Sequence, residues 1–237
     1  MSVLDKLSRF FFPERCVFCG ALSVDGEPCD ECIAAAKECE IVGETCSKCG
    51  KAKNKCECNK TNYLFSGVAA VYYNIGVAKD GVYGIKMSHR AFAAKYFGEK
   101  MADSFKDKFS VVPDLVCSVP CDRKTLRQRG YNHADLLAKA VAKKLSLPYD
   151  SKILKKIKNN KPQHTLDAAA RRRNVKGVYE ATTRLDGKTV LLVDDIKTTG
   201  STLNECAKQL RLMGAKEVYC SVGLISNISC NEGKNKI

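Results

Sequence analysis

A run of five β-favouring residues, Thr189 to Val193, leads directly into a pair of aspartates, Asp194 and Asp195. A hydroxyl-rich segment with one glycine follows, and apolar residues then recur at helical spacing from Leu203 to Leu210. A strand that stops at a polar loop before a helix is where α/β proteins place a ligand crevice. The sequence therefore predicts an α/β fold with a ligand site in this loop.

The loop has the composition of a phosphate cradle. Its backbone N–H groups and the N-terminus of the following helix can point at one anion. Gly200 lets the backbone approach the anion closely, and the neighbouring side chains add hydroxyl donors. The hydroxyl-bearing residues are Thr198, Thr199, Ser201 and Thr202.

The aspartates indicate what the phosphate is attached to. Carboxylates beside an anion site require hydroxyl donors or a cation, which a ribose and Mg²⁺ supply. A sugar phosphate with free vicinal hydroxyls fits both halves of the motif. The alternative is a plain helix cap after a buried strand, but a cap needs one aspartate and not two.

Eight cysteines within the first 58 residues form four close pairs. The pairs are Cys16/Cys19, Cys29/Cys32, Cys46/Cys49 and Cys56/Cys58. Two Cys-x-x-Cys pairs complete a tetrahedral Zn²⁺ shell, so the spacing predicts two structural Zn²⁺ sites in a double zinc ribbon. We favour the sequential partition, four cysteines to each ion, and an interleaved one stays open. Cys58 is the least regular ligand because Cys-x-Cys is less usual.

A disulfide framework or a redox dithiol is the competing interpretation. The chain has no apolar signal-peptide core, which favours a cytoplasmic protein. Disulfides are disfavoured in that reducing compartment. Cys121 and the other unpaired cysteines are interpreted as small core residues.

Composition and chain length suggest three regions. We expect the zinc ribbon with a short amphipathic helix over residues 1–60, an α/β domain over 61–226, and a polar tail over 227–237. No apolar stretch is long enough to span a bilayer, so stable membrane insertion is not expected. The formal charge of +14 falls to about +10 when eight thiolates hold two Zn²⁺. That excess favours polyanionic ligands.

Four further elements are predicted from apolar patterning. Residues 67–73 and 115–119 form apolar runs typical of strands, and Ala94 to Phe105 carries a helical stripe. The second strand ends in Pro120, Cys121, Asp122 and Arg123, and the basic stretch continues to Arg129. A basic segment after a strand end is a second candidate anion site. A helix with its inner face from Ala134 to Leu145 follows it.

The stretch from Val190 to Thr202 resembles the phosphoribosyl-diphosphate signature of type I phosphoribosyltransferases. The resemblance implies that Asp194 and Asp195 hold the ribose hydroxyls and that residues 198–202 hold the 5′-phosphate. It also implies that the loop after the early strand, with Pro120, Cys121, Asp122, Arg123 and Arg129, binds the leaving diphosphate. Lys197 is an extra cation whose role the resemblance leaves open.

The chain more narrowly resembles the ComF competence-protein family and its relative GntX. The cysteine ribbon, the Ser118-Val119-Pro120 loop and the Arg129-Gly130-Tyr131-Asn132 motif carry this resemblance. His133 stands where that family usually has Gln. The basic segment 155–176, with Gln163 and Arg171, is expected to form a hood over the substrate, with a solvated loop as the alternative. All three histidines are interpreted as structural or solvated.

The resemblance implies a Mg²⁺-assisted transfer of a phosphoribosyl group from phosphoribosyl diphosphate to an acceptor that the residues do not specify. It also associates such proteins with DNA uptake in natural competence. A second hypothesis is therefore a non-catalytic module that senses a metabolite or binds single-stranded DNA or a competence helicase. The catalytic status stays open between these two hypotheses.

Overall fold

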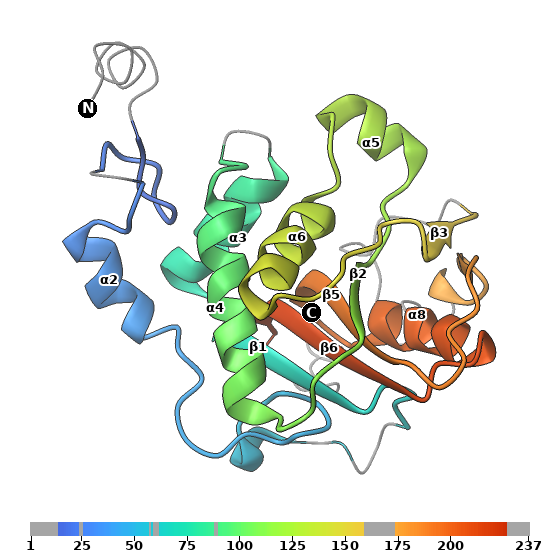
Figure 1. Cartoon of the computed structure of the whole chain (residues 1–237). Helices are drawn as coiled ribbons and strands as arrows, with labels where there is room; N and C mark the ends of the chain where they lie inside the picture. Colours follow the sequence, from blue (N-terminus) through green and yellow to red (C-terminus); the bar gives the residue numbers. More distant parts are fainter. Residues whose placement is uncertain are drawn as a thin grey trace, which may run out of the picture.

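The computed structural model describes residues 14–23, 26–56, 58, 62–87, 90–158 and 174–226. Its centre is a four-stranded sheet in the order β1-β6-β5-β2, with every neighbouring pair parallel. The strands are β1 (Gly67–Tyr73), β2 (Leu115–Ser118), β5 (Thr189–Lys197) and β6 (Glu217–Ile225). Because all four run in the same direction, their carboxyl ends meet at one edge (Figure 1).

Helices cover both faces of this sheet. The helices α3 (Gly76–Lys86), α4 (Ala93–Lys108) and α6 (His133–Leu145) pack on one face. The helix α8 (Ser201–Leu212) lies on the other, together with the antiparallel pair β3 (Leu154–Lys156) and β4 (Tyr179–Ala181) (Figure 1). The predicted α/β fold class is confirmed, and the structure is a mostly parallel sheet flanked by helices.

Strand β5 shows why the sheet needs two layers of helices. Leu191 and Val193 belong to the core on the α4 and α6 side, whereas Val190 and Leu192 belong to the core on the α8 side. Successive side chains of a strand point to opposite faces, so a continuous apolar run must be covered twice. The Leu203-to-Leu210 stripe of α8 is buried as the spacing predicted.

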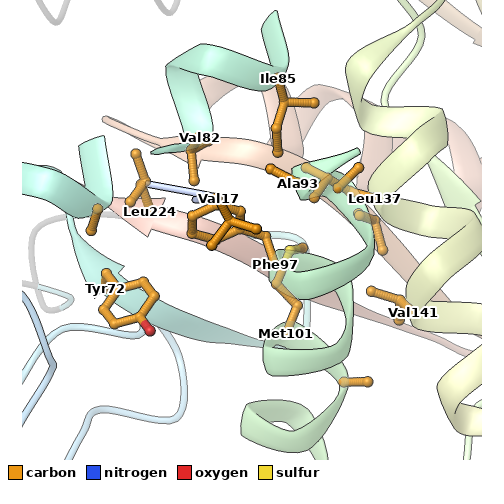
Figure 2. Packing of buried hydrophobic residues seen from close by; sticks show 14 of the residues in the cluster. Val17, Tyr72, Val82, Ile85, Ala93, Phe97, Met101, Leu137, Val141 and Leu224 are labelled. Atoms are coloured by element: carbon orange, nitrogen blue, oxygen red, sulfur yellow. The ribbon is translucent and has the colours of Figure 1, made fainter. Parts of the chain in front are cut away.

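The core beneath α4 includes the cysteine-rich segment. Phe97 and Met101 point from α4 toward Val82 and Ile85 of α3, and Val17 packs among them (Figure 2). Farther along, Val68 donates a backbone hydrogen bond to Ser47 (3.0 Å). The cysteine-rich segment therefore shares its core with the α/β domain, and the boundary at residue 60 stays a prediction.

Strand β5 is longer than the sequence suggested. It continues through both aspartates to Lys197, because β6 pairs with it as far as Lys197↔Ile225. The expectation that the strand stops before Asp194 was wrong. A neighbouring strand extended the ladder into residues that local propensity assigns to a loop.

Helix α3 had no counterpart in the sequence analysis, because glycines interrupt its pattern. The structure explains one of them. A Cβ at Gly81 would lie 2.6 Å from the ring of Phe97, so only glycine lets α3 approach α4 this closely.

The basic stretch after β2 also differs from the expected loop. It is a helix, α5 (Arg123–Arg129), which is capped by Asp122 at its start and by left-handed Gly130 at its end. Two further short helices lie in the cysteine-rich segment: α2 (Asp30–Lys37) and the 3₁₀ turn η1 (Lys53–Lys55). No helix in the described ranges combines the length and the apolar character required to cross a membrane.

Candidate functional site

The two aspartates lie near the carboxyl end of β5 and are almost buried, with 8% of Asp194 and 7% of Asp195 exposed. Adjacent side chains in a strand start toward opposite faces. Here the carboxylates nevertheless converge with the imidazole of His133, since one ligand atom of each lies within 4.8 Å of the others. A buried pair of carboxylates demands compensation from its surroundings.

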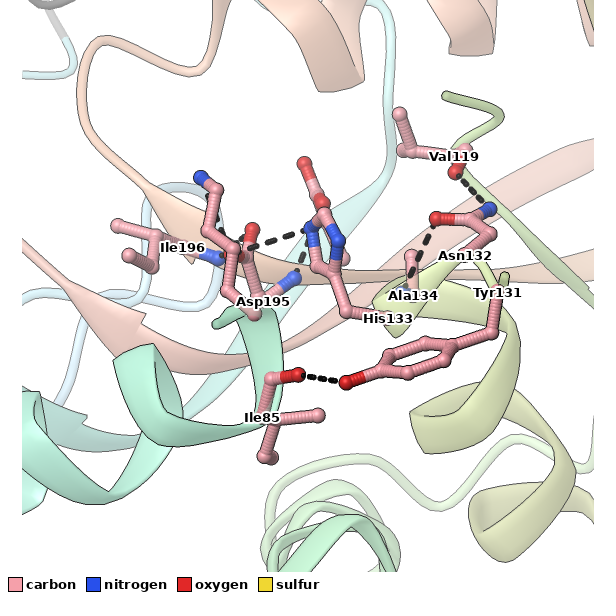
Figure 3. Close-up of polar contacts among 10 residues, drawn as sticks. Ile85, Val119, Tyr131, Asn132, His133, Ala134, Asp195 and Ile196 are labelled. Atoms are coloured by element: carbon pink, nitrogen blue, oxygen red, sulfur yellow. Dashed lines mark hydrogen bonds and ion pairs between the residues drawn. The ribbon is translucent and has the colours of Figure 1, made fainter. Parts of the chain in front are cut away.

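Two basic side chains face Asp195. Nε2 of His133, at the start of α6, is 3.3 Å from Oδ2 of Asp195, and Nζ of Lys86, at the end of α3, is 3.8 Å from the same oxygen (Figure 3). Burial alone would raise the pKa of Asp195, but His133 and Lys86 hold it below its usual range. Burial and the charge of Asp195 raise the pKa of Asp194 well above its usual range. Their surroundings therefore shift the pKa values of the two carboxyl groups in opposite directions.

The Arg-Gly-Tyr-Asn motif positions Lys86 and His133. The hydroxyl of Tyr131 donates to the backbone carbonyl of Ile85 (2.6 Å), next to Lys86 (Figure 3). The side-chain amide N–H of Asn132 donates to the carbonyl of Val119 (3.0 Å). The side-chain oxygen of Asn132 accepts from the backbone N–H of Ala134, so Asn132 caps α6. Asn132 thus ties the end of the β2 segment to the start of α6 and sets His133 against Asp195.

The phosphate loop, residues 198–202, turns sharply from β5 into α8. Gly200 has φ +77° and precedes Ser201, the first residue of α8. The hydroxyls of Thr199 and Ser201 are 2.7 Å apart. The hydroxyl of Tyr63 donates to the carbonyl of Thr199 (3.2 Å). The first-turn amides of a helix have no intrahelical partners, so this turn can present donors to an anion.

The loop after β2 is fixed through Asp122. The carboxylate of Asp122 accepts from the backbone N–H of Thr125 (2.7 Å) and pairs with Lys156 of β3 at 3.4 Å. The hydrogen bond from the N–H of Thr125, together with the charge of Lys156, lowers the pKa of Asp122. Pro120 and Arg129 are half-buried, while Arg123 is exposed on α5.

Cys121 is half-buried in this loop. Burial first, and then the charges of Asp122 and Asp135, raise the pKa of its thiol. A raised pKa disfavours the nucleophilic thiolate form. The environment agrees with its interpretation as a small packing residue.

The eight paired cysteines gather into two groups of four. The first cluster is Cys16, Cys19, Cys29 and Cys32, and the second cluster is Cys46, Cys49, Cys56 and Cys58. The structure thus groups them sequentially. Cys39 is in neither cluster, and its thiol donates to the carbonyl of Ile75 (3.4 Å).

The sulfur separations fit zinc. Sγ of Cys19 is 3.9 Å from that of Cys29, and the pairs Cys46–Cys58 and Cys49–Cys56 are each 3.7 Å apart. Tetrahedral Zn²⁺ with Zn–S bonds of about 2.3 Å sets its sulfurs about 3.8 Å apart. Both clusters therefore have a donor set and spacing that could hold Zn²⁺.

The structure brings most of the predicted site residues to one edge of the sheet. Asp194 and Asp195 lie in the last part of β5, and the phosphate loop and the segment 120–122 follow the carboxyl ends of β5 and β2. Gln163 and Arg171 lie outside the described residues. The sequence analysis did not identify His133 as a site residue. The available signal was that His133 begins the helix after β2, directly after the capping Asn132, and the start of such a helix lies at the carboxyl edge of a parallel sheet.

Comparison with known proteins shows what this arrangement is related to. Residues 130–236 match the family model of the phosphoribosyl transferase domain. Competence protein F of Haemophilus influenzae is 37% identical over 110 residues, 45% of this chain and 48% of that protein. The DNA utilization protein YhgH of Escherichia coli O157:H7 is 35% identical over 111 residues, 46% and 49% of the respective chains. The chain is homologous to these competence and DNA utilization proteins.

The chain spans about half the length of the curated relatives it matches. Similarity to solved structures is looser. The glutamine phosphoribosylpyrophosphate amidotransferase from B. subtilis is 24% identical with a TM-score of 0.38, covering 63% of this chain and 28% of that one. A purine phosphoribosyltransferase from Pyrococcus horikoshii is 21% identical with a TM-score of 0.35, covering 55% and 71%. The similarity of this homologue of competence protein F to the phosphoribosyl transferase domain is the family-model match over residues 130–236.

Proposed function

We propose that this homologue of competence protein F binds phosphoribosyl diphosphate with Mg²⁺ at the carboxyl edge of its sheet and transfers the phosphoribosyl group. One observation carries the proposal. A buried pair of acids, Asp194 and Asp195, is followed at once by a tight hydroxyl-bearing turn at a helix N-terminus. A ribose 5-phosphate offers the hydroxyls and the anion that these two features require.

In this proposal each of the two acids holds one ribose hydroxyl. Asp195 accepts a hydrogen bond from one ribose hydroxyl, and Asp194 contacts the other. Amides and hydroxyls of the phosphate loop hold the 5′-phosphate. His133 and Lys86 are positioning residues that keep Asp195 in place and charged.

The diphosphate lies toward the loop after β2. Pro120 and Cys121 line its approach, Arg123 and Arg129 supply positive charge, and Asp122 positions the loop through its cap and its pair with Lys156. Asp194 and Asp195 are oxygen donors of the type that Mg²⁺ prefers, and Mg²⁺ is typically held by one or two carboxylates together with substrate phosphates. When bound, the ion would neutralise diphosphate charge.

The residues at this edge act by holding and orienting. Breaking the bond at the anomeric carbon develops positive charge on the sugar, which a fixed carboxylate nearby stabilises. Fixing the 5′-phosphate and both hydroxyls removes the freedom of the ribose before the reaction. The transfer needs no nucleophilic side chain from the protein.

Titration calorimetry with phosphoribosyl diphosphate and Mg²⁺ tests the proposal. We expect the wild type to bind and the double variant Asp194→Asn/Asp195→Asn to lose measurable affinity. Asp103→Asn is the matched control, because this half-exposed acid pairs with Lys144 away from the sheet edge. Equal affinity in all three proteins would refute the assignment of the acids.

A specific observation favours a second candidate, a module that binds single-stranded DNA or a helicase partner. Helix α5 has no buried residue, and Arg123, Lys124 and Arg127 are exposed on it. Figure 1 shows this helix standing away from the sheet. The names of the relatives, competence protein F and DNA utilization protein YhgH, support this candidate.

Salt dependence distinguishes the two candidates. Binding of single-stranded DNA through phosphate contacts weakens steeply as salt rises. We expect the triple variant Arg123→Gln/Lys124→Gln/Arg127→Gln to lower both the affinity and the salt slope if α5 carries this interaction. DNA affinity that is unchanged in the triple variant would exclude α5 as the contact surface.

A further inference from the structure

A chain of contacts links the second cluster to the phosphate loop. A short strap, residues 63–66, connects the two regions along the chain, since it follows Cys58 closely and packs on α8. Leu64 donates its N–H to the side chain of Asn204 (2.6 Å), and its carbonyl accepts from Arg211 (2.6 Å). On the other side, Lys48, which lies between two cysteines of the second cluster, donates to the carbonyl of Phe65 (2.6 Å).

The strap also reaches the turn of the phosphate loop. The ring of Tyr63 stacks on Phe65 at 4.6 Å between centroids, and its hydroxyl donates to the carbonyl of Thr199. A Cβ placed on Gly200 would lie 3.1 Å from this ring. Tyr63 is therefore in van der Waals reach of the loop that the proposed function assigns to the 5′-phosphate.

Lys197 makes a second connection. It is the last residue of β5, is only 2% exposed, and lies with Nζ 5.3 Å from the centre of the Tyr63 ring. Its Cε would be 3.1 Å from a Cβ on Gly200, so its stem forms part of the floor under the loop. Burial lowers the pKa of Lys197, and the charges of Cys49 and Cys58 act in the opposite direction.

A buried cation needs a nearby negative charge. Four thiolates with one Zn²⁺ carry a net charge of −2, whereas an empty cluster whose thiols are protonated carries none. Metal loading thus changes the electrostatic environment of Lys197, and it fixes Cys58, which precedes the strap. Both changes act on the turn Thr199-Gly200, the first through Lys197 and the second through Tyr63.

We propose that Lys197 and Tyr63 are positioning residues through which metal loading of the second cluster sets the geometry of the phosphate loop, and with it the affinity for a sugar phosphate. The affinity part of this inference rests on the proposed function. The geometric part does not, because the contacts from the cluster to the loop exist without a ligand.

The test is a double-mutant cycle in the full-length chain. Cys58→Ser disables the second cluster, and Lys197→Met removes the cation while it keeps most of the stem. Lys108→Met is the matched control: Lys108 is also largely buried beside this cluster and donates to the carbonyl of Cys46 (3.0 Å), but it comes from α4. The measurements are amide hydrogen exchange of residues 198–202, zinc content, and affinity for ribose 5-phosphate.

We expect Cys58→Ser to accelerate exchange in the loop by about tenfold. Lys197→Met should accelerate it with both zinc ions retained, and Cys58→Ser should then add less than about twofold. In the Lys108→Met background the full effect of Cys58→Ser should persist. Affinity for ribose 5-phosphate should fall in parallel with loop protection.

Wild-type exchange rates in zinc-loaded Lys197→Met would overturn the inference, as would an undiminished effect of Cys58→Ser in that background. Should Cys58→Ser not fold, the zinc-loaded Lys197→Met and Lys108→Met proteins decide the question alone. A wild type that binds neither ribose 5-phosphate nor phosphoribosyl diphosphate refutes the proposed function, while the exchange data still decide whether the cluster controls the loop.

Discussion

Nε2 of His133 lies 3.3 Å from Oδ2 of Asp195, and this contact joins the start of α6 to the end of β5. The histidine is 12% exposed on its side chain and the aspartate 9%, so water screens the pair poorly. The contact makes the two adjacent aspartates different, because the close contacts from His133 and Lys86 both end on Oδ2 of Asp195. A site for two neighbouring hydroxyls benefits from that difference.

Replacing His133 tests the contact. His133→Leu leaves a buried carboxylate oxygen with only Lys86 nearby, which should lower the free energy of unfolding by about 1–3 kcal/mol. His133→Gln keeps a donor at this position and should lower it by less. Urea denaturation of both variants measures the difference. Equal destabilisation by Leu and Gln would mean that packing, and not the contact with Asp195, explains the loss.

The raised pKa of Asp194 gives a pH dependence with a definite sign. In the folded protein its pKa is raised, so between the usual carboxyl value near 4 and the raised value the folded state holds a proton that the unfolded state releases. The free energy of unfolding therefore falls as pH rises through this window. Asp194→Asn removes the titration and should be more stable near neutral pH.

The expected gain for Asp194→Asn is on the order of 1 kcal/mol, or roughly 2–4 °C in Tm for a chain of this size. Thermal melts of both proteins from pH 4 to 8 should diverge as pH rises, with the variant above the wild type. Parallel melting curves over this range would show that Asp194 does not titrate with the raised pKa. The same substitution should weaken sugar-phosphate binding.

Comparing two glycines with similar φ distinguishes the cost of backbone strain from the cost of side-chain crowding at the phosphate loop. Gly200 and Gly187 have φ of +77° and +73°, but only a Cβ at Gly200 would meet Lys197 and Tyr63, whereas Gly187 faces open space. Gly187→Ala should cost about 1–2 kcal/mol from the left-handed backbone alone. Gly200→Ala should cost more, and it alone should lower affinity for ribose 5-phosphate. Matching denaturation midpoints would argue against tight contact beneath the loop.

Zinc content tests the two clusters directly. Elemental analysis should find two zinc ions per chain in the wild type and one in Cys19→Ala. Cys39→Ala is the control, because this buried thiol lies outside both clusters, and it should retain two. Chelation of the first cluster should lower Tm, since Phe18, between Cys16 and Cys19, packs edge-on against Tyr72 and Phe97 of the core. Two zinc ions in Cys19→Ala would assign that site to other ligands.

The sequence by itself determined the features whose signals are local. The apolar run before Asp194, the hydroxyl-rich turn after it, the buried stripe of α8 and the close cysteine pairs each depend on residues near one another in the chain. Spacing and residue type therefore predicted them. The same local reasoning was wrong where another part of the chain decided. Strand β6 extended β5 through both aspartates, and α3 packs closely on α4 because its Gly81 admits the ring of Phe97.

Only the tertiary structure decided which side chains surround the acids and the loop. His133, Lys86 and Tyr63 come from three segments that are distant in the sequence, and parallel pairing of the strands brings their ends to one edge of the sheet. Sequence periodicity cannot predict such long-range contacts, because a histidine after a helix cap has the same local pattern whether or not a carboxylate faces it. Long-range strand order supplied that carboxylate, and it made an unremarkable histidine part of the site.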